Sequence, residues 1–203
     1  MKNNVEKIIK NIKSLYRGYH PYFLEKQDPY LSEKNKKNED LVPTYGEILP
    51  NGVNKLINHL KINKNDVFVD LGCGNGKVVL QFCLQTPVKN CIGIEFSSTR
   101  IKQALEIKNK IKEKNRMNYI RGNFLNKKID FSSGTIFYSA STCFSEETMM
   151  KIWKKIMQNK NLNAIIVLKD FPSSCDFSRV KGTKELNVGC SWAVSEAKIY
   201  YFK

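Results

Sequence analysis

The stretch D-V-F-V-D-L-G-C-G-N-G-K, residues 66–77, decides how the rest of the chain is interpreted. Its apolar run, Val67 to Val69, predicts a buried strand, and Asp70 follows at the end of that strand. Glycines then alternate at positions 72, 74 and 76, and an apolar helical pattern starts near Val78. Glycine permits a sharp turn and close approach of a ligand to the backbone, and the following helix N-terminus offers free N–H groups. The stretch therefore predicts a strand, a ligand-binding turn and a helix.

The spacing of the glycines bears on the kind of ligand. It is G-x-G-x-G, whereas the dinucleotide fingerprint is G-x-G-x-x-G. Asp70 stands two positions before the first glycine, where a carboxylate would repel a pyrophosphate and attract the ammonium group of an amino acid. This pattern resembles motif I of the methyltransferases that use S-adenosyl-L-methionine. The resemblance implies that cofactor, with S-adenosyl-L-homocysteine as product, and a second acidic residue after the next strand. Glu95 stands there.

Apolar strand and helix patterns alternate from this stretch to the C-terminus. Strands are expected at 67–69, 91–95, 118–120, 135–139 and 164–168, with helices at 77–85, 99–114 and 145–158. Residues 184–190 and 194–202 predict a terminal antiparallel pair. The alternation predicts an α/β fold with a doubly wound sheet, and the resemblance makes it a Rossmann-like seven-stranded methyltransferase sheet with helices on both faces. The ligand would lie beyond the carboxyl ends of its strands.

Two further helical patterns, residues 3–17 and 47–60, precede the sheet. Residues 19–45 between them predict a loop-rich connector whose charged part, Ser32 to Asp40, is expected to be mobile. We therefore divide the chain into an N-terminal helix with its connector, residues 1–41, and a methyltransferase domain, residues 42–203. The first helix is expected to pack on that domain; the alternative is a lid or a helix that docks a partner.

Composition limits the partners and the compartment. The 203 residues carry a formal net charge of +15, and the excess is spread along the chain, with its densest part between residues 100 and 116. A polyanionic partner such as nucleic acid or a nucleosome would fit this charge, although a solvated helix face would explain it equally. No apolar run is long enough to predict a membrane span, and no secretory signal is seen. Six cysteines without a C-x-x-C pair predict no metal site and a reduced, intracellular protein.

Several motifs beyond the glycine turn narrow the resemblance. They are Y-G-E at 45–47, V-V-L-Q at 78–81, T-I-F-Y-S-A-S-T-C-F-S-E-E-T at 135–148, S-W at 191–192 and I-Y-Y at 199–201. Together they resemble the disruptor-of-telomeric-silencing family of non-SET histone lysine methyltransferases, over roughly residues 42–203. The resemblance implies methylation of a protein lysine, with a core histone in the nucleosome as the first substrate to consider.

The resemblance also implies which residues form the site. Cofactor-binding positions would be Thr44, Tyr45, Glu47, Asp70, Gly72, Cys73, Gly74, Glu95, Asn123 and Phe124. Asp70 and the glycine turn would hold the amino-acid part, Glu95 the ribose, and Asn123 and Phe124 the adenine. The family usually has Asp where Asn123 stands.

A channel for the target lysine is implied by the same family. Ser139 and Ser141 stand where the family places Asn beside it, and Trp192 and Tyr200 would line it. No general base is expected, because burial beside a sulfonium lowers the pKa of a lysine.

Alternatives remain open at this level. They are a lysine methyltransferase of a non-histone protein, for example a mitochondrial one; a methyltransferase of RNA or a small molecule; and a basic binding module without activity. The absence of N-P-P-Y, D-P-P-Y and P-C motifs after the fourth predicted strand disfavours methylation of nucleic acid, but leaves methylation of a ribose or of a ring nitrogen open. The protein would be nuclear if it acts on histones, and otherwise cytoplasmic or mitochondrial.

Overall fold

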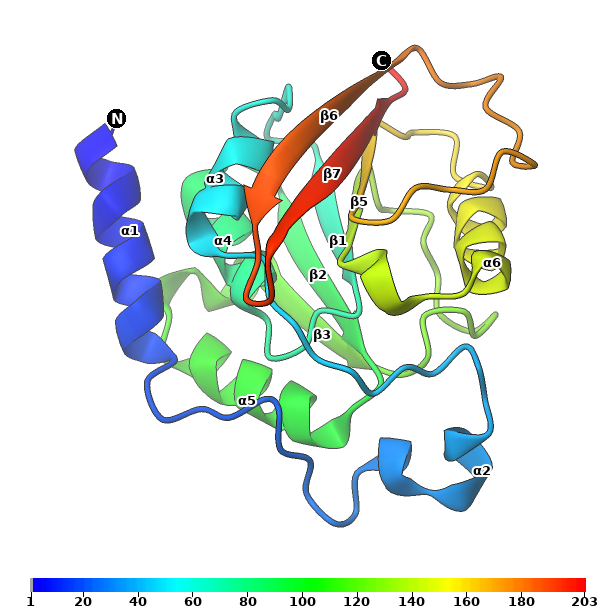
Figure 1. Ribbon diagram of the computed structural model, residues 1–203. Helices are drawn as coiled ribbons and strands as arrows, with labels where there is room; N and C mark the ends of the chain where they lie inside the picture. Colours follow the sequence, from blue (N-terminus) through cyan, green and yellow to red (C-terminus); the bar gives the residue numbers. More distant parts are fainter. Residues whose placement is uncertain (1) are drawn as a thin grey trace.

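The computed structural model describes residues 2–203, which contain a seven-stranded sheet of order β3-β2-β1-β4-β5-β7-β6 (Figure 1). The strands β1 to β5 are parallel where they pair with one another, and β7 runs antiparallel to both β5 and β6. The predicted fold class is confirmed. The strand bounds are Val67–Leu71 (β1), Asn90–Glu95 (β2), Met117–Arg121 (β3), Ile136–Ser139 (β4), Ala164–Val167 (β5), Gly182–Gly189 (β6) and Val194–Tyr201 (β7).

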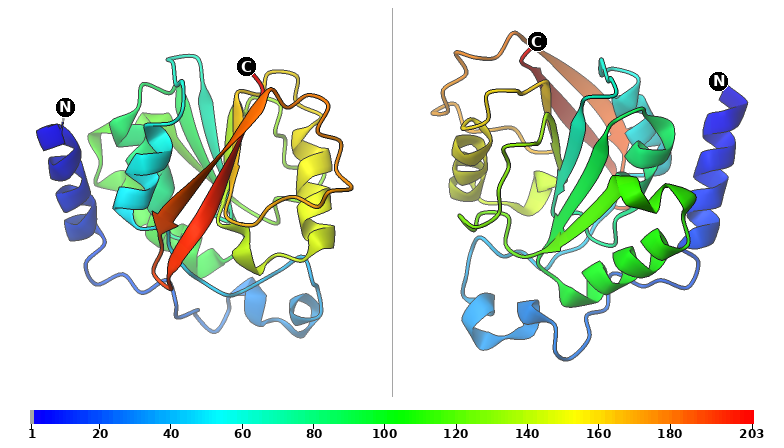
Figure 2. Two further views of the ribbon diagram at one scale, coloured as in Figure 1. Left: turned by 45° about the horizontal axis from the view of Figure 1, so that its top comes forward. Right: turned by 180° about the vertical axis from the view of Figure 1, so that it is seen from behind.

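Helices cover both faces of this sheet, with α3 and α4 on one side and α6 on the other (Figures 1 and 2). One apolar core includes Phe68, Leu80 and Ile199, and the core on the opposite face includes Val69 and Trp153. The helix bounds are Lys2–Leu15 (α1), Glu33–Lys36 (α2), Pro50–Ile57 (α3), Lys77–Gln85 (α4), Ser98–Asn109 (α5) and Glu146–Ile156 (α6), with short 3-10 turns at Pro29–Leu31, Lys112–Arg116 and Ser141–Cys143. In the described part of the chain, no helix is long and apolar enough to cross a bilayer.

The first helix, α1, packs on the sheet domain as expected. Ile12 and Tyr16 are buried in the same core as Phe68. The Tyr16 hydroxyl donates to the backbone oxygen of Asn75 at 3.0 Å, which ties α1 to the glycine turn. Gly18, with φ of +86°, lies beyond the end of the helix. Where the methyltransferase domain begins stays a prediction.

Two predicted helices are shorter in the structure. The helix expected at 47–60 starts only at Pro50, because Ile48 forms an antiparallel bridge with Cys190 and the Leu49 N–H bonds the Gly189 oxygen at 2.8 Å. The helix expected at 99–114 ends at Asn109, since Ile111 has extended backbone angles and is buried.

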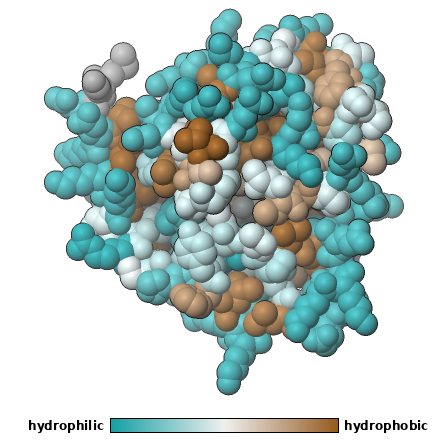
Figure 3. Space-filling view, viewed as in Figure 1, coloured by the Kyte–Doolittle hydropathy of each residue, from teal (hydrophilic) through white to brown (hydrophobic). Residues whose placement is uncertain are grey.

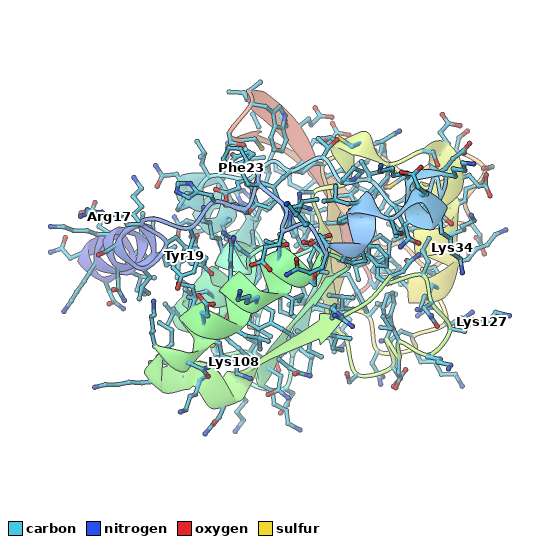
Figure 4. All side chains as sticks on the ribbon, turned by 90° about the horizontal axis from the view of Figure 1, so that it is seen from below. Arg17, Tyr19, Phe23, Lys34, Lys108 and Lys127 are labelled. Carbon is cyan, nitrogen blue, oxygen red and sulfur yellow. The ribbon has the colours of Figure 1, made fainter. Side chains whose placement is uncertain are left out.

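The connector between α1 and α3 runs across one end of the sheet. Seen from below, it passes from α1 to α2, with Phe23 and Lys34 along it (Figure 4). The connector therefore covers the edge of the sheet at which the ligand was expected.

Hydrophilic residues dominate the face shown in Figure 3, and hydrophobic residues form separate patches on it.

Candidate active site

A cavity of about 380 Å³ lies at the carboxyl ends of β1, β2 and β4. Its wall includes all ten positions expected to bind a cofactor, as well as Trp192. The connector and the loop that follows it supply part of this wall, from Tyr30 to Glu47. The structure thus brings residues far apart in sequence to one pocket, at the edge where α/β sheets bind ligands.

The glycine turn forms the floor of the pocket. Gly72, Gly74 and Gly76 have φ values of +83°, +55° and +85°, the left-handed region that side chains other than glycine's disfavour. A Cβ on Gly74 would lie 2.5 Å from Cε2 of Tyr45, so a side chain there would displace the tyrosine ring. The turn thus depends on glycine both for its conformation and for the close packing of Tyr45.

Two buried carboxylates flank this turn. Glu95 accepts hydrogen bonds from Gly74 N at 3.0 Å and Ser97 N at 2.8 Å. Asp70 is 2% exposed, and its Oδ1 has no hydrogen-bond partner in the protein. Burial, followed by the charge of Glu95, raises the pKa of Asp70 well above its usual value. An ammonium group would compensate this unpaired carboxylate, and the pocket therefore suits a ligand with an amino-acid end.

Arg100 links the connector to Glu95. The residue is 3% exposed, and its guanidinium donates from Nε to the Pro21 oxygen at 3.1 Å and from Nη2 to the Pro43 oxygen at 2.7 Å. It also lies 4.0 Å from Glu95 and contacts the ring faces of Tyr30 and Tyr45, at 5.6 and 4.8 Å from their centroids. The sequence interpretation missed this role, because the carbonyls that Arg100 binds are 57 and 79 positions away.

Asp28 makes a second attachment of the connector. Its carboxylate accepts hydrogen bonds from Ser97 Oγ at 2.5 Å, Thr99 N at 3.0 Å and Tyr30 N at 3.1 Å. Burial alone would raise the pKa of Asp28, but these hydrogen bonds outweigh it and hold the pKa below its ordinary value. Asp28 therefore fixes the connector against the N-terminal end of α5.

The loop between connector and α3 carries a polar network. Glu47 pairs with Lys77 Nζ at 2.5 Å, and the Tyr45 hydroxyl lies 2.8 Å from the same Glu47 oxygen. Trp192 packs directly on Gly46, where a Cβ would collide with its ring, while its indole nitrogen donates to Ser195 Oγ at 3.1 Å. Trp192 is still 44% exposed. The loop is thus held between the glycine turn and the β6–β7 hairpin.

Lys155 supports the loop that carries Asn123 and Phe124, two residues of the pocket wall. Its Nζ donates to the backbone oxygens of Phe124 and Asn126, both at 2.6 Å, and burial lowers its pKa. Asn123 Oδ1 accepts from Leu125 N at 2.8 Å, so this amide already shapes the turn. Lys155 was not singled out from the sequence, because a lysine on an amphipathic helix is ordinarily solvated.

Three of the four residues expected to line a lysine channel do not line this cavity. Ser139 is buried and donates to the Leu71 oxygen at 2.9 Å, and Ser141 bonds the backbone of Lys169. Tyr200 is buried on the α6 face among Trp153 and other aromatic rings, and its hydroxyl bonds Asp170. The expectation was therefore wrong about their location, since each side chain is engaged in the interior; Ala140, Thr142 and Cys143 line the wall instead.

Comparison with known proteins places the chain in a family. A family model described as "Histone methylation protein DOT1" matches residues 34–200. The chain belongs to the DOT1 family. The resemblance stated from the sequence motifs is therefore confirmed.

Relatives of this DOT1 family member are much longer than the matched region. A Caenorhabditis elegans protein, "Histone-lysine N-methyltransferase, H3 lysine-79 specific", is 28% identical over 77% of this chain and 19% of its own length. A "Protein-lysine N-methyltransferase" of Saccharolobus islandicus is 30% identical over 41% of this chain and 51% of its own length. The chain thus spans only part of each relative.

Solved structures share the fold of the DOT1 family member. An RNA methyltransferase from Salinibacter ruber in complex with S-adenosyl-L-homocysteine matches with a TM-score of 0.56, 15% identity and coverage of 74% of this chain and 89% of its own. A dimethyladenosine transferase from Plasmodium falciparum matches with a TM-score of 0.59, 14% identity and coverage of 77% and 63%. At these identities the similarity shows a methyltransferase fold and no more.

Proposed function

We propose that this chain is a protein-lysine N-methyltransferase that uses S-adenosyl-L-methionine and acts on a core histone lysine in the nucleosome. The observation that carries the proposal is the pocket of this DOT1 family member, in which two buried carboxylates flank a glycine turn at the end of β1. The named relatives that methylate lysine support the substrate class.

The residues of the pocket fit the cofactor. The unpaired Oδ1 of Asp70 would accept from its ammonium group, and Glu95 would accept from the ribose hydroxyls. Asn123 and Phe124 would contact the adenine. When bound, S-adenosyl-L-methionine supplies an electrophilic methyl group.

The protein contributes mainly alignment and exclusion of water. The connector, fixed by Arg100 and Asp28, covers the pocket from one side, and Trp192 limits it on another. A lysine in the pocket would lose its proton to solvent before methyl transfer, because desolvation and a neighbouring sulfonium both lower the pKa of its amine. No residue is assigned as a general base.

The surface charge supports a nucleosomal substrate. Arg17, Lys34 and Lys127 are exposed on the side of the molecule shown in Figure 4, where the connector crosses the sheet. A net charge of +15 favours approach to polyanionic DNA. With such a substrate the protein would act in the nucleus.

Methyl transfer from labelled S-adenosyl-L-methionine tests the proposal with three substrates in parallel: intact nucleosomes, free histones and total RNA. Label on a nucleosomal histone would support it. Label on RNA alone would overturn the lysine assignment.

A further inference from the structure

Tyr138 is a buried polar residue of the pocket that the roles above leave unused. It lies on β4, lines the cavity, and is 2% exposed. Among the described residues, its hydroxyl oxygen is one of five buried side-chain nitrogen or oxygen atoms that have no hydrogen-bond partner. Asp70 Oδ1 is another, and Asp70 and Tyr138 are register partners on adjacent parallel strands, so both side chains point to the same face of the sheet. The same wall thus carries two unpaired polar groups.

A buried hydroxyl without a protein partner costs stability unless a ligand or an ordered water in the pocket meets it. A phenylalanine would fill the same space without that cost. Burial, followed by the charge of Asp70, raises the pKa of Tyr138 well above its usual value, so the phenol is neutral at physiological pH. A neutral phenol offers one acceptor and one donor to a ligand in the pocket.

The strand order indicates which bound group Tyr138 faces, the cofactor or the substrate. Glu95 ends β2, Asp70 lies on β1 and Tyr138 lies on β4, which are consecutive strands of the sheet. If Glu95 holds the ribose and Asp70 the amino-acid end, Tyr138 lies one strand further on. There the wall continues with Ala140 and Trp192. Thr142 and Cys143 follow on the same wall. Apolar surface beside a neutral phenol oxygen matches a lysine side chain, which is an alkyl chain ending in nitrogen.

We propose that the Tyr138 hydroxyl accepts a hydrogen bond from the amine of the target lysine and positions that nitrogen for methyl transfer. The inference rests on the proposed lysine methyltransferase function. A phenol suits this role better than a carboxylate, because a carboxylate would stabilise the ammonium form and oppose its deprotonation. Tyr138 is thus a positioning residue for the substrate and not a contact of the cofactor.

A binding experiment tests this without relying on turnover. The probes are S-adenosyl-L-homocysteine and its analogue in which a primary aminoalkyl chain takes the place of the transferable methyl group. We expect the analogue to bind the wild-type chain about fivefold more tightly, the gain that one net hydrogen bond to a neutral amine gives. Tyr138→Phe should abolish this gain, leave the Kd for S-adenosyl-L-homocysteine unchanged, and leave Tm equal or higher. Its kcat for lysine methylation should fall, with KM for the cofactor unchanged.

The matched control is Tyr201→Phe, whose hydroxyl bonds the His59 oxygen at 3.0 Å and which does not line the cavity. It should keep the preference for the analogue. If Tyr138→Phe weakens both probes equally, lowers Tm markedly, or preserves the gain, the proposal is overturned. If the wild-type chain binds neither probe, the proposed function itself fails, which is a distinguishable result.

Discussion

Arg100→Met should detach the connector from the pocket. Arg100 is buried and donates two hydrogen bonds, to the oxygens of Pro21 and Pro43 at 3.1 and 2.7 Å. A hydrogen bond from a charged donor contributes about 1.5–3 kcal/mol, and two of them about 3–6 kcal/mol. Methionine can still pack between the rings that flank Arg100, so we expect a net loss of about 3–4 kcal/mol in the free energy of unfolding. Most domains would stay folded after such a loss.

The assay combines urea denaturation with calorimetric titration of S-adenosyl-L-homocysteine. Because Thr44 and Tyr45 form part of the wall, a partly detached connector leaves only a fraction of molecules competent to bind. We expect the apparent Kd to rise by about tenfold or more.

Lys102→Met is the control for this variant, since it removes one positive charge from the same helix. Lys102 pairs with Glu25 at 3.1 Å, but both side chains are exposed, at 61% and 39%. This variant should match the wild type in unfolding and in binding. If Arg100→Met lost less than about 1 kcal/mol and bound the ligand normally, Arg100 would not be what holds the connector on the pocket.

Three other variants probe the pocket and the connector. Gly72→Arg should abolish binding of S-adenosyl-L-homocysteine, because the arginine side chain fills the turn. Gly72→Ala should retain part of the binding, because its Cβ meets no atom within 4 Å and it shares only the backbone strain. Equal loss of affinity in a titration of both variants would refute a steric cause. Trp192→Ala should leave cofactor affinity nearly intact and reduce methyl transfer to nucleosomes, and equal loss of both would mark Trp192 as structural. Asp28→Asn should unfold at lower urea concentration than the wild type at neutral pH. Because the folded-state pKa of Asp28 is lowered, the stability that its carboxylate contributes is present above the unfolded pKa of about 4 and is lost as pH falls through the folded-state pKa. The free energies of unfolding of the wild type and Asp28→Asn should therefore become equal in acid. A difference that stays constant with pH would contradict this.

Sequence patterns predicted the fold well where the pattern is local. The buried run at β1, the positive-φ glycines after it and Glu95 at the end of β2 are all set by neighbours in the chain, and the structure places them together. The motifs also predicted that the loop at Tyr45 lines the pocket, but this prediction came only from the family resemblance.

The residues that sequence reasoning missed act through distant partners. Arg100 binds carbonyls of the connector, and Lys155 on α6 binds a loop about 30 positions away. Neither pairing leaves a periodic signal, because the acceptors are backbone atoms. Tyr200 was misplaced for a related reason: alternation along β7 does not say which face of the sheet meets the pocket, and α6 covers the face that Tyr200 occupies.

Site-resolved mass spectrometry of nucleosomal histones shows whether this chain methylates a histone lysine. Nucleosomes are incubated with the chain and with S-adenosyl-L-methionine that carries a deuterated methyl group. We expect deuterated methyl on a lysine side-chain nitrogen with the wild-type chain, and none with Gly72→Arg. Deuterated methyl on another residue type, or the same lysine label with both chains, would contradict this expectation.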